Sequence, residues 1–466
     1  MTPISTPRRA FRSSSSGFTL VEMIVVTLLL LIAMVGLLAV FDASARINKN
    51  ETDVADAQGN VRYGIYQMTR AIRMAGAGGL YVTQAVLNHN DASLPGIDPS
   101  GTSYDNVGNN VTVTATDGRT WTVRPGTDMI EVRGVLFSPL LGFVEEGGCA
   151  PCTGNSPLNV RAIAGNAEVG EYLNNDPSIR PQFATIDAYT ASASSTNPML
   201  VIVQDAKSEL HTCADPNPTG LHRYPQPAYN VGVLNQHTDL VTSNTFNAVD
   251  FGGTLGPRFN TELPSGSDQP AVPITILKRA GVLDDVVFFI TTDPALDPNG
   301  LHPFLAQGIR RGNAFEVTRL ADDVEDMQVA YGIDADGDGA VGRSTASGCP
   351  PADPLGNDPD PNFSTTAGCD EWNPNVDGEI APVDAQFQQQ NPFNPAHDGA
   401  ATHCPRLHAV MISLLAKAKD SDPTYRGPAA QGYKIMNSTA APITPGNYRR
   451  RIQTLKINLR NYAYQG

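Results

Sequence analysis

The residue with the most evident chemistry is Glu22, the one charged residue between Phe18 and Phe41. A carboxylate at depth in a lipid-facing helix costs about 2.5–3.5 kcal/mol, so such residues usually have a partner and a function. The polar sequence changes to apolar between Gly17 and Phe18, and cleavage there would create an α-amine at the end of the apolar segment. When such segments bundle, the carboxylate of one and the amine of another can neutralise each other. Glu22 would then favour assembly.

A second group of carboxylates lies in the segment Asp334-Ala335-Asp336-Gly337-Asp338-Gly339. This pattern fits the start of a calcium loop, because carboxylates two residues apart can converge on one hard cation. An EF-hand would need a glutamate at position 345, where Thr345 stands, and no helical pattern flanks the loop. We expect either a non-helical calcium site with Asp334, Asp336 and Asp338 as ligands or an Asp/Gly turn without metal. Nothing else in the sequence requires a cofactor.

All six cysteines follow the apolar segment, so they would face an oxidising compartment, where an even number favours disulfides. They are Cys149, Cys152, Cys213, Cys349, Cys369 and Cys404. Cys349 and Cys369 bracket a loop rich in Pro, Asp and Asn, and we expect these two to pair. Cys149 and Cys152 form a C-x-x-C that we interpret as structural. The alternatives are a redox pair or half of a zinc site completed by His403, Cys404 and His408.

No catalytic signature accompanies these residues. The sequence has no G-x-S-x-G, H-E-x-x-H, P-loop or G-x-G-x-x-G pattern, so we expect a protein that is not an enzyme. The one basic cluster, Arg449-Arg450-Arg451, belongs to a chain with a formal net charge of −15. We therefore expect no nucleic-acid partner and interpret this cluster as an exposed strand start.

Glu22 must be positioned by residues 18–41. As a helix these residues would be roughly 36 Å long, enough to cross a hydrocarbon core of about 30 Å. Three arginines and no acid precede Glu22, which predicts a cytoplasmic N-terminus and a translocated remainder. A signal anchor that keeps Met1, a conventional signal peptide and a buried core helix are alternatives that leave Glu22 unexplained. Ala43-Ser44-Ala45 fits a signal-peptide cleavage site, but the apolar run exceeds the usual length of about 7–15 residues.

The helix is predicted to continue to residue 75. Its second half has an amphipathic stripe, and Gly76, Gly78 and Gly79 supply a stop. The stripe consists of Val54, Val61, Ile65, Met68 and Ile72. Two helices broken near Gly59 are the alternative.

After Leu80 the sequence predicts short strands separated by turns. The segments 111–114 and 120–123 flank Asp117-Gly118 and predict a hairpin. Residues 128–133 alternate and predict a strand, and residues 407–415 are nearly continuously apolar, as in a central strand buried on both faces. The remaining strand predictions are 199–203, 272–277, 286–291, 315–320, 324–333 and 452–459, with irregular tracts over 145–198, 210–270 and 334–404. The expected class is α+β, a long helix, half transmembrane, packed on a β-rich, loop-rich head.

The N-terminus resembles a known class of signal. Gly17-Phe18-Thr19-Leu20-Val21-Glu22, after a basic leader and before the apolar run, is similar to the class III signal of type IV pilins and type II secretion pseudopilins. The resemblance implies cleavage after Gly17, N-methylation of Phe18 by a prepilin peptidase, and a role for Glu22 in subunit docking. No proline lies between Phe18 and Pro95, so the kinking proline of many major pilins is missing, which favours a minor subunit.

Three further segments, residues 126–133, 324–334 and 449–461, resemble the PilW group of minor pilins. That resemblance implies a pilin-like head in an assembly-initiating tip complex with other minor pilins, a tip adhesin and the major pilin. It also implies an inner-membrane protein with a periplasmic head that later joins the pilus, serving adhesion and twitching motility. The expected parts are a leader (1–17), an assembly helix (18–41), its amphipathic continuation (42–79) and the head (80–466). The alternatives are a minor pseudopilin of type II secretion, a membrane-anchored adhesin or binding protein and, least favoured, an enzyme.

Overall fold

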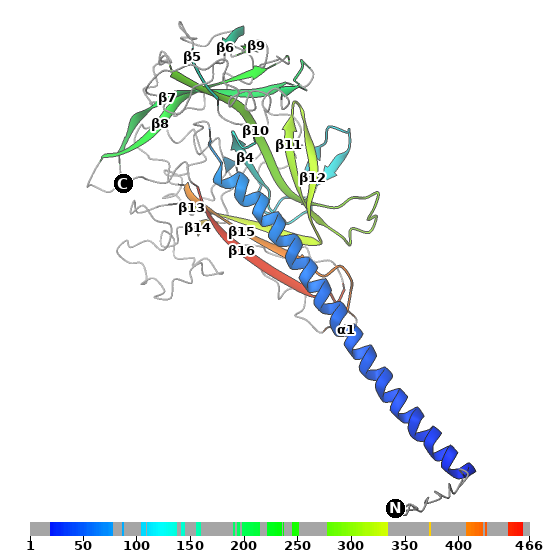
Figure 1. The fold of residues 1–466 in the computed structure, drawn as a ribbon. Coiled ribbons are helices and arrows are strands. Elements are labelled where there is room, and N and C mark those ends of the chain that lie inside the picture. The colour runs from blue at the N-terminus through cyan, green and yellow to red at the C-terminus, as the bar shows by residue number, and fades with distance from the viewer. Residues whose placement is uncertain are drawn as a thin grey trace, which may run out of the picture. The chain divides into compact units, whose positions relative to one another are not determined.

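A computed structural model describes residues 19–77, 86–87, 104–108, 110–137, 141–144, 155–159, 190–191, 193–195, 198–214, 221–234, 236, 245–250, 277–333, 372–373, 407–422, 425 and 446–459. One long helix is followed by strands, which confirms the expected α+β class (Figure 1). The chain forms two units, Met1–Ala55 and Asp56–Gly466, and helix α1 (Leu20–Arg73) has residues in both.

Helix α1 continues through Gly59, so the prediction of a single helix is confirmed. It ends where Gly76 adopts a φ of 73°, the left-handed conformation that commonly closes a helix. The N–H of Gly76 donates to the carbonyl of Arg133 at 2.9 Å, and the N–H of Val135 donates to the carbonyl of Ala77 at 2.8 Å. These two bonds hold the end of the helix against the strand that contains Arg133.

Among the described residues, the strands form antiparallel sheets of ten, four and two strands. The ten-stranded sheet consists of β1 (Val86–Leu87), β4 (Ile130–Gly134), β5 (Leu141–Val144), β6 (Asn155–Asn159), β7 (Met199–Ala214), β8 (Leu221–Leu234), β9 (Thr245–Asp250), β10 (Leu277–Thr291), β11 (Phe304–Arg311) and β12 (Ala314–Asp322). The four-stranded sheet consists of β13 (Val324–Ile333), β14 (Trp372–Asn373), β15 (Leu407–Lys417) and β16 (Arg450–Asn458). The two-stranded sheet is the predicted hairpin, β2 (Thr112–Thr114) with β3 (Thr120–Thr122).

Strand β10 organises the large sheet. Its first half pairs with β5 and β7, whereas its second half pairs with β4 and β11. In the four-stranded sheet, β15 lies between β13 and β16 in the order β14-β13-β15-β16. Residues 409–416 of β15 are buried, which confirms the prediction of a central strand from its apolar sequence.

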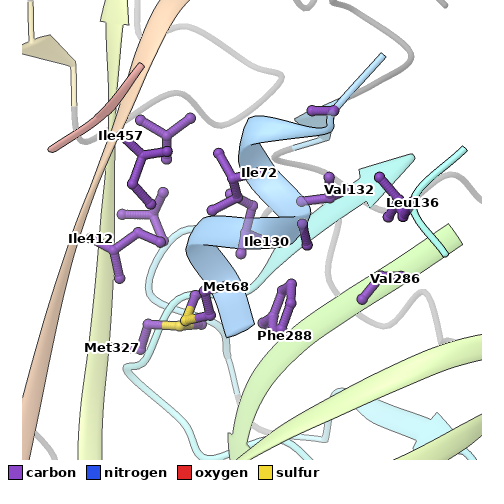
Figure 2. Close-up of a cluster of buried hydrophobic side chains, with 14 of the residues drawn as sticks. Met68, Ile72, Ile130, Val132, Leu136, Val286, Phe288, Met327, Ile412 and Ile457 are labelled. Carbon is purple, nitrogen blue, oxygen red and sulfur yellow. The ribbon is translucent and has the colours of Figure 1, made fainter. Parts of the chain in front are cut away.

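The main core lies around the second half of α1. Figure 2 shows Met68 and Ile72 between Ile412 and Ile457 on one side and Ile130, Val286 and Phe288 on the other. This part of the helix is therefore packed between the two larger sheets. The predicted stripe is confirmed for its buried members Val61, Ile65, Met68 and Ile72, while Val54 is half-buried.

A second core lies on the other face of β10. Val286, Phe288 and Ile290 belong to the helix-facing core, whereas the alternating Val287 and Phe289 belong to a cluster with residues of β2 and β11. Strand β10 is thus buried on both faces, with the period of two expected of a strand.

The tract 210–270 contains more regular structure than its sequence predicted. Strand β8 and strand β9 lie within it, and β7 runs on to Ala214. Strand β8 includes Pro225 and Pro227, which pair with Leu210 and Ser208 of β7. Proline donates no N–H to a ladder, so its presence argues against a strand in the sequence. The tracts 145–198 and 334–404 likewise contain the short strands β6 and β14.

Candidate assembly site

The described chain begins with a capping box formed by Thr19 and Glu22. The N–H and Oγ1 of Thr19 donate to Oε2 of Glu22 at 2.9 and 3.0 Å, and the N–H of Glu22 donates to Oγ1 of Thr19 at 3.3 Å. The N–H of Met23 completes the turn by donating to the carbonyl of Thr19 at 3.2 Å. The carboxylate of Glu22 therefore satisfies the N–H of Thr19, and the hydroxyl oxygen of Thr19 satisfies the N–H of Glu22, two groups that the first turn of a helix would leave unpaired.

The sequence reasoning missed this local role, although the signal is present as Thr19-x-x-Glu22, a Ser/Thr followed three residues later by Glu. A capping box accounts for a glutamate at this position without any neighbouring chain. Docking to a second subunit must therefore be tested with a variant that separates the charge of Glu22 from its hydrogen bonds.

The helix that starts at this cap is long and apolar enough to cross a membrane. Its large apolar side chains between Leu20 and Phe41 are all exposed, from 49% for Val25 to 77% for Leu20. An apolar surface of this extent calls for lipid or other helices as its surroundings. The segment thus has the properties of a membrane anchor and of a helix-bundling element.

The described parts of the three segments that resemble PilW minor pilins, residues 126–133, 324–333 and 449–459, contact one another. Asp128 accepts the N–H of Asn106 at 2.8 Å and that of Val329 at 2.7 Å, and the amide of Gln328 donates to the carbonyl of Gly126 at 3.2 Å. Residues 126–133 therefore lie against β13. Burial raises the pKa of Asp128 well above its usual range.

The third segment joins the same strand from the other side. Arg450 of β16 donates from Nε and Nη2 to the carboxylate of Glu325 at 2.6 and 3.2 Å, and both side chains are nearly fully buried. Arg449 pairs with Asp422 at 3.0 Å. Arg451 is exposed. The prediction of an exposed basic strand start is therefore wrong for Arg450, because a sequence does not show which carboxylate a long side chain will meet.

A buried charge cluster links β4, β10 and β11. Glu131 accepts a hydrogen bond from the hydroxyl of Tyr104 at 2.9 Å and one from Arg133 at 3.0 Å. Arg310 donates to Asp285 at 2.5 Å, and Arg133 lies 3.5 Å from the same carboxylate. The predicted strand in residues 128–133 is present as β4, and although alternation is typical of a strand with one solvated face, Glu131 and Arg133 are fully buried. Both faces of this strand are covered, and the polar side chains pair with one another.

The two carboxyls of this cluster titrate in opposite directions. Burial, followed by the neighbouring charge of Asp285, raises the pKa of Glu131 to about 8. Burial opposes ionisation of Asp285, but Arg310 and Arg133 outweigh it and lower its pKa to about 2. The cluster thus favours a proton on Glu131 over one on Asp285, beside the guanidinium groups of Arg133 and Arg310. This arrangement joins strands, and the pocket that Asp285 and Arg310 help to line has a volume of about 20 Å³, room for about one water molecule.

Many of the predicted site residues lie outside the described residues. These are Gly17, Phe18, Cys149, Cys152, Cys349, Cys369, Cys404, Asp334, Asp336, Asp338 and His403. Cys213 lies in β7 opposite His222, and His408 lies in β15. Within the ranges that the structure describes, no group of three His, Cys, Asp or Glu side chains is arranged to hold a metal ion.

Comparison with known proteins identifies the N-terminal signal. Residues 12–38 match the prokaryotic N-terminal methylation motif. Among solved structures, the chain is similar to a type IV-like pilin from Thermus thermophilus, with 12% identity over 61% of this chain and 98% of that one. Its TM-score is 0.16, too low for a shared fold to follow. No protein of curated function is significantly similar to the chain. The chain thus carries a prepilin-type methylation motif at the start of an exposed apolar helix.

Proposed function

We propose that this protein is a minor, PilW-like subunit of a type IV pilus that acts in an assembly-initiating complex at the tip. The observation that carries the proposal is the methylation motif at residues 12–38, which coincides with a capped helix whose apolar face is exposed. Such a segment suits a structural subunit better than an enzyme.

Processing would follow from the signal. A prepilin peptidase would cleave after Gly17 and methylate Phe18, leaving Thr19 and Glu22 at the first turn of the mature helix. Before assembly the helix would hold the protein in the inner membrane with the head in the periplasm. Residues 18–41 would then exchange lipid for the helices of other subunits in the pilus.

The size of the head supports a minor rather than a repeating subunit. Residues 56–466 form one unit, and a body of this size is difficult to repeat along a thin fibre. A rare or terminal position avoids that crowding. The partners would be other minor pilins, a tip adhesin and the major pilin, and the pilus would serve adhesion and twitching motility.

The head would be held further by disulfides among its cysteines, including Cys349 with Cys369, and by calcium at Asp334, Asp336 and Asp338. Peptide mapping without reduction reads the cysteine pairing directly. Equilibrium dialysis against ⁴⁵Ca²⁺ measures calcium binding, with the Asp336→Asn variant as the control.

The proposal is tested by deleting the gene and complementing it with the wild-type chain. We expect fewer surface pili and weaker twitching in the deletion strain, and the complementing protein in the pili sheared from cells. Normal piliation together with impaired export of secreted enzymes would instead favour a pseudopilin. Normal piliation and normal export, with loss of surface attachment alone, would favour a membrane-anchored adhesin.

A further inference from the structure

The outward side of the second half of α1 carries a row of basic and aromatic side chains. The row consists of Arg62, Tyr66, Arg70 and Arg73, at intervals of four, four and three residues, with Tyr63 beside them. This spacing places them on one side of a helix. All are exposed, Tyr63 by 52% and Tyr66 by 63%. We call these five residues the arginine–tyrosine face.

The opposite side of the same helix is buried in the main core, so the arginine–tyrosine face points away from the head. The face also differs in charge from the rest of the chain. Between Ala57 and Ala77 the sequence has three arginines and no acidic residue, whereas the whole chain has a net charge of −15.

The three arginines of this face have no carboxylate partner among the described residues. Within the described parts of the chain, none of their guanidinium groups has an ion-pair partner. Arg133 and Arg310 of the head, by contrast, are buried against Asp285. Three unpaired guanidinium groups in a row, with two exposed tyrosine rings between them, form a surface suited to an acidic partner.

Water, a membrane and a nucleic acid each fit the arginine–tyrosine face less well than a protein does. An ordinary solvated helix face gains from Glu–Lys pairs four residues apart, and none occurs here. A membrane surface attracts charge only within about a Debye length, roughly 8 Å, whereas Arg62 follows Phe41 by about 32 Å of helix. A nucleic acid would be repelled by the net charge of the remaining chain. A protein surface is therefore the partner that fits this face best.

We propose that the arginine–tyrosine face docks onto an acidic surface of a different pilin-like subunit in the same assembly. Tyrosine and arginine are enriched at the energetic centres of protein interfaces. Guanidinium groups also bind carboxylates through paired, directional hydrogen bonds, which fix the orientation of one subunit on the next. The proposal deepens the proposed function and rests on it, because it requires that the chain enters an assembly.

The test places a photo-crosslinking residue, p-benzoylphenylalanine, at Tyr66 in the full-length chain expressed in its own cells. We expect illumination of sheared pili to yield an adduct with a second polypeptide that itself begins with a methylated residue. Mass spectrometry should place the cross-link in a peptide rich in Asp and Glu. The same probe at Arg119, an exposed position in the β2–β3 hairpin, is the positional control.

Charge reversal provides the second arm. Replacing Arg62, Arg70 and Arg73 together by Glu should lower the adduct yield about tenfold or more, which corresponds to about 1.4 kcal/mol of coupling. The triple Arg→Lys variant should lower it less, and Arg119→Glu should leave it unchanged. Because all three arginines are exposed, a melting temperature equal to that of the wild type would show that the triple variant is folded.

Several outcomes overturn the proposal. These are incorporation of the chain without an adduct at Tyr66, an adduct with lipid or with a second copy of this chain, a cross-linked peptide without acidic residues, and a yield that charge reversal does not change. If the chain keeps Met1 and is absent from pili, the proposed function fails, and this proposal fails with it. Incorporation of the processed chain without the adduct contradicts only the docking proposal.

Discussion

At the scale of single residues, the structure allows the capping role of Glu22 to be separated from the assembly role that we propose for it. Its carboxylate accepts the N–H and hydroxyl of Thr19, so it caps the helix within its own chain. Its charge is the property that would interact with the amine of a neighbouring Phe18. A glutamine keeps the hydrogen-bonding oxygen and removes the charge, whereas an alanine removes both.

We therefore predict that Glu22→Gln and Glu22→Ala both abolish incorporation into pili while leaving membrane insertion intact. Thr19→Ala, which removes a cap worth about 0.5–2 kcal/mol but keeps the carboxylate, should reduce incorporation only partly. Quantitative immunoblots of sheared pili and of membranes give the ratio of assembled to membrane-inserted protein. If Glu22→Gln assembles like the wild type, capping rather than charge explains the residue.

The sequence allowed Glu22 to be singled out because one charge in an apolar run is conspicuous. It did not reveal Glu131, Arg133 or Arg450 as buried, because alternation of polar and apolar residues normally marks a solvated face. Those side chains are buried because their partners come from strands distant in the sequence, such as Asp285 for Arg133 and Glu325 for Arg450. Pairing of this kind depends on topology and not on local pattern.

At the scale of the elements, two glycines of α1 make opposite predictions. A Cβ on Gly64 would lie 2.8 Å from Cδ2 of Leu305 and 3.3 Å from Cβ of Ala321, whereas a Cβ on Gly59 would have no atom within 4 Å. Leu305 is fully buried and has little room to move. The close approach of the helix to β11 and β12 thus depends on the missing side chain of Gly64.

We predict that Gly64→Ala lowers the free energy of unfolding by about 1–3 kcal/mol through overpacking. Gly59→Ala should instead raise it by up to about 1 kcal/mol, because alanine favours the helix and this position is exposed. Thermal unfolding of the two variants in detergent provides the comparison. Equal effects of the two substitutions would contradict the packing of α1 on the head.

The buried stripe of α1 gives a second prediction. Met68 is fully buried between the two larger sheets, so Met68→Ala should cost about 2–5 kcal/mol. Tyr66→Ala, two residues away and exposed, should change stability by no more than about 0.5 kcal/mol. A melting temperature that falls only for Met68→Ala would support the arrangement in Figure 2. Similar losses for both would argue against it.

The elements themselves were largely predictable. Local patterns predict the helix, its glycine stop, the hairpin at Gly118 and the central strand β15, because each pattern lies within one contiguous segment. Strand β11 was not predicted, and β10 is one strand where two, 272–277 and 286–291, were predicted. Strands β8 and β9 were not predicted because prolines and polar residues obscure the period of two. Their pairing with β7 and with each other is a long-range property.

At the scale of the whole molecule, the buried carboxyls make stability depend on pH. The pKa of Glu131 is raised to about 8, and burial raises that of Asp326 to about 6. Both groups bind a proton more tightly in the folded chain than in the unfolded one. Their contributions are fully present below the unfolded pKa values near 4.5 and 3.8 and are lost as the pH rises through the folded values.

We therefore predict that the melting temperature falls between about pH 5 and pH 8.5. Asp285 does not reverse this trend, because its lowered pKa of about 2 gives a contribution that is lost only in strong acid. Glu131→Gln mimics the protonated carboxyl and should flatten the dependence above pH 6. A melting temperature that rises over this range, or an unchanged slope in the variant, would contradict the raised pKa of Glu131.

The proposed role of the whole chain depends on one processing event at its N-terminus. Mass spectrometry of the intact protein from native membranes or sheared pili tests that event most directly. We predict a chain that begins at Phe18 and carries one N-terminal methyl group. A chain that begins at Met1 or at Arg46 would contradict this role and would favour a membrane-anchored or secreted binding protein.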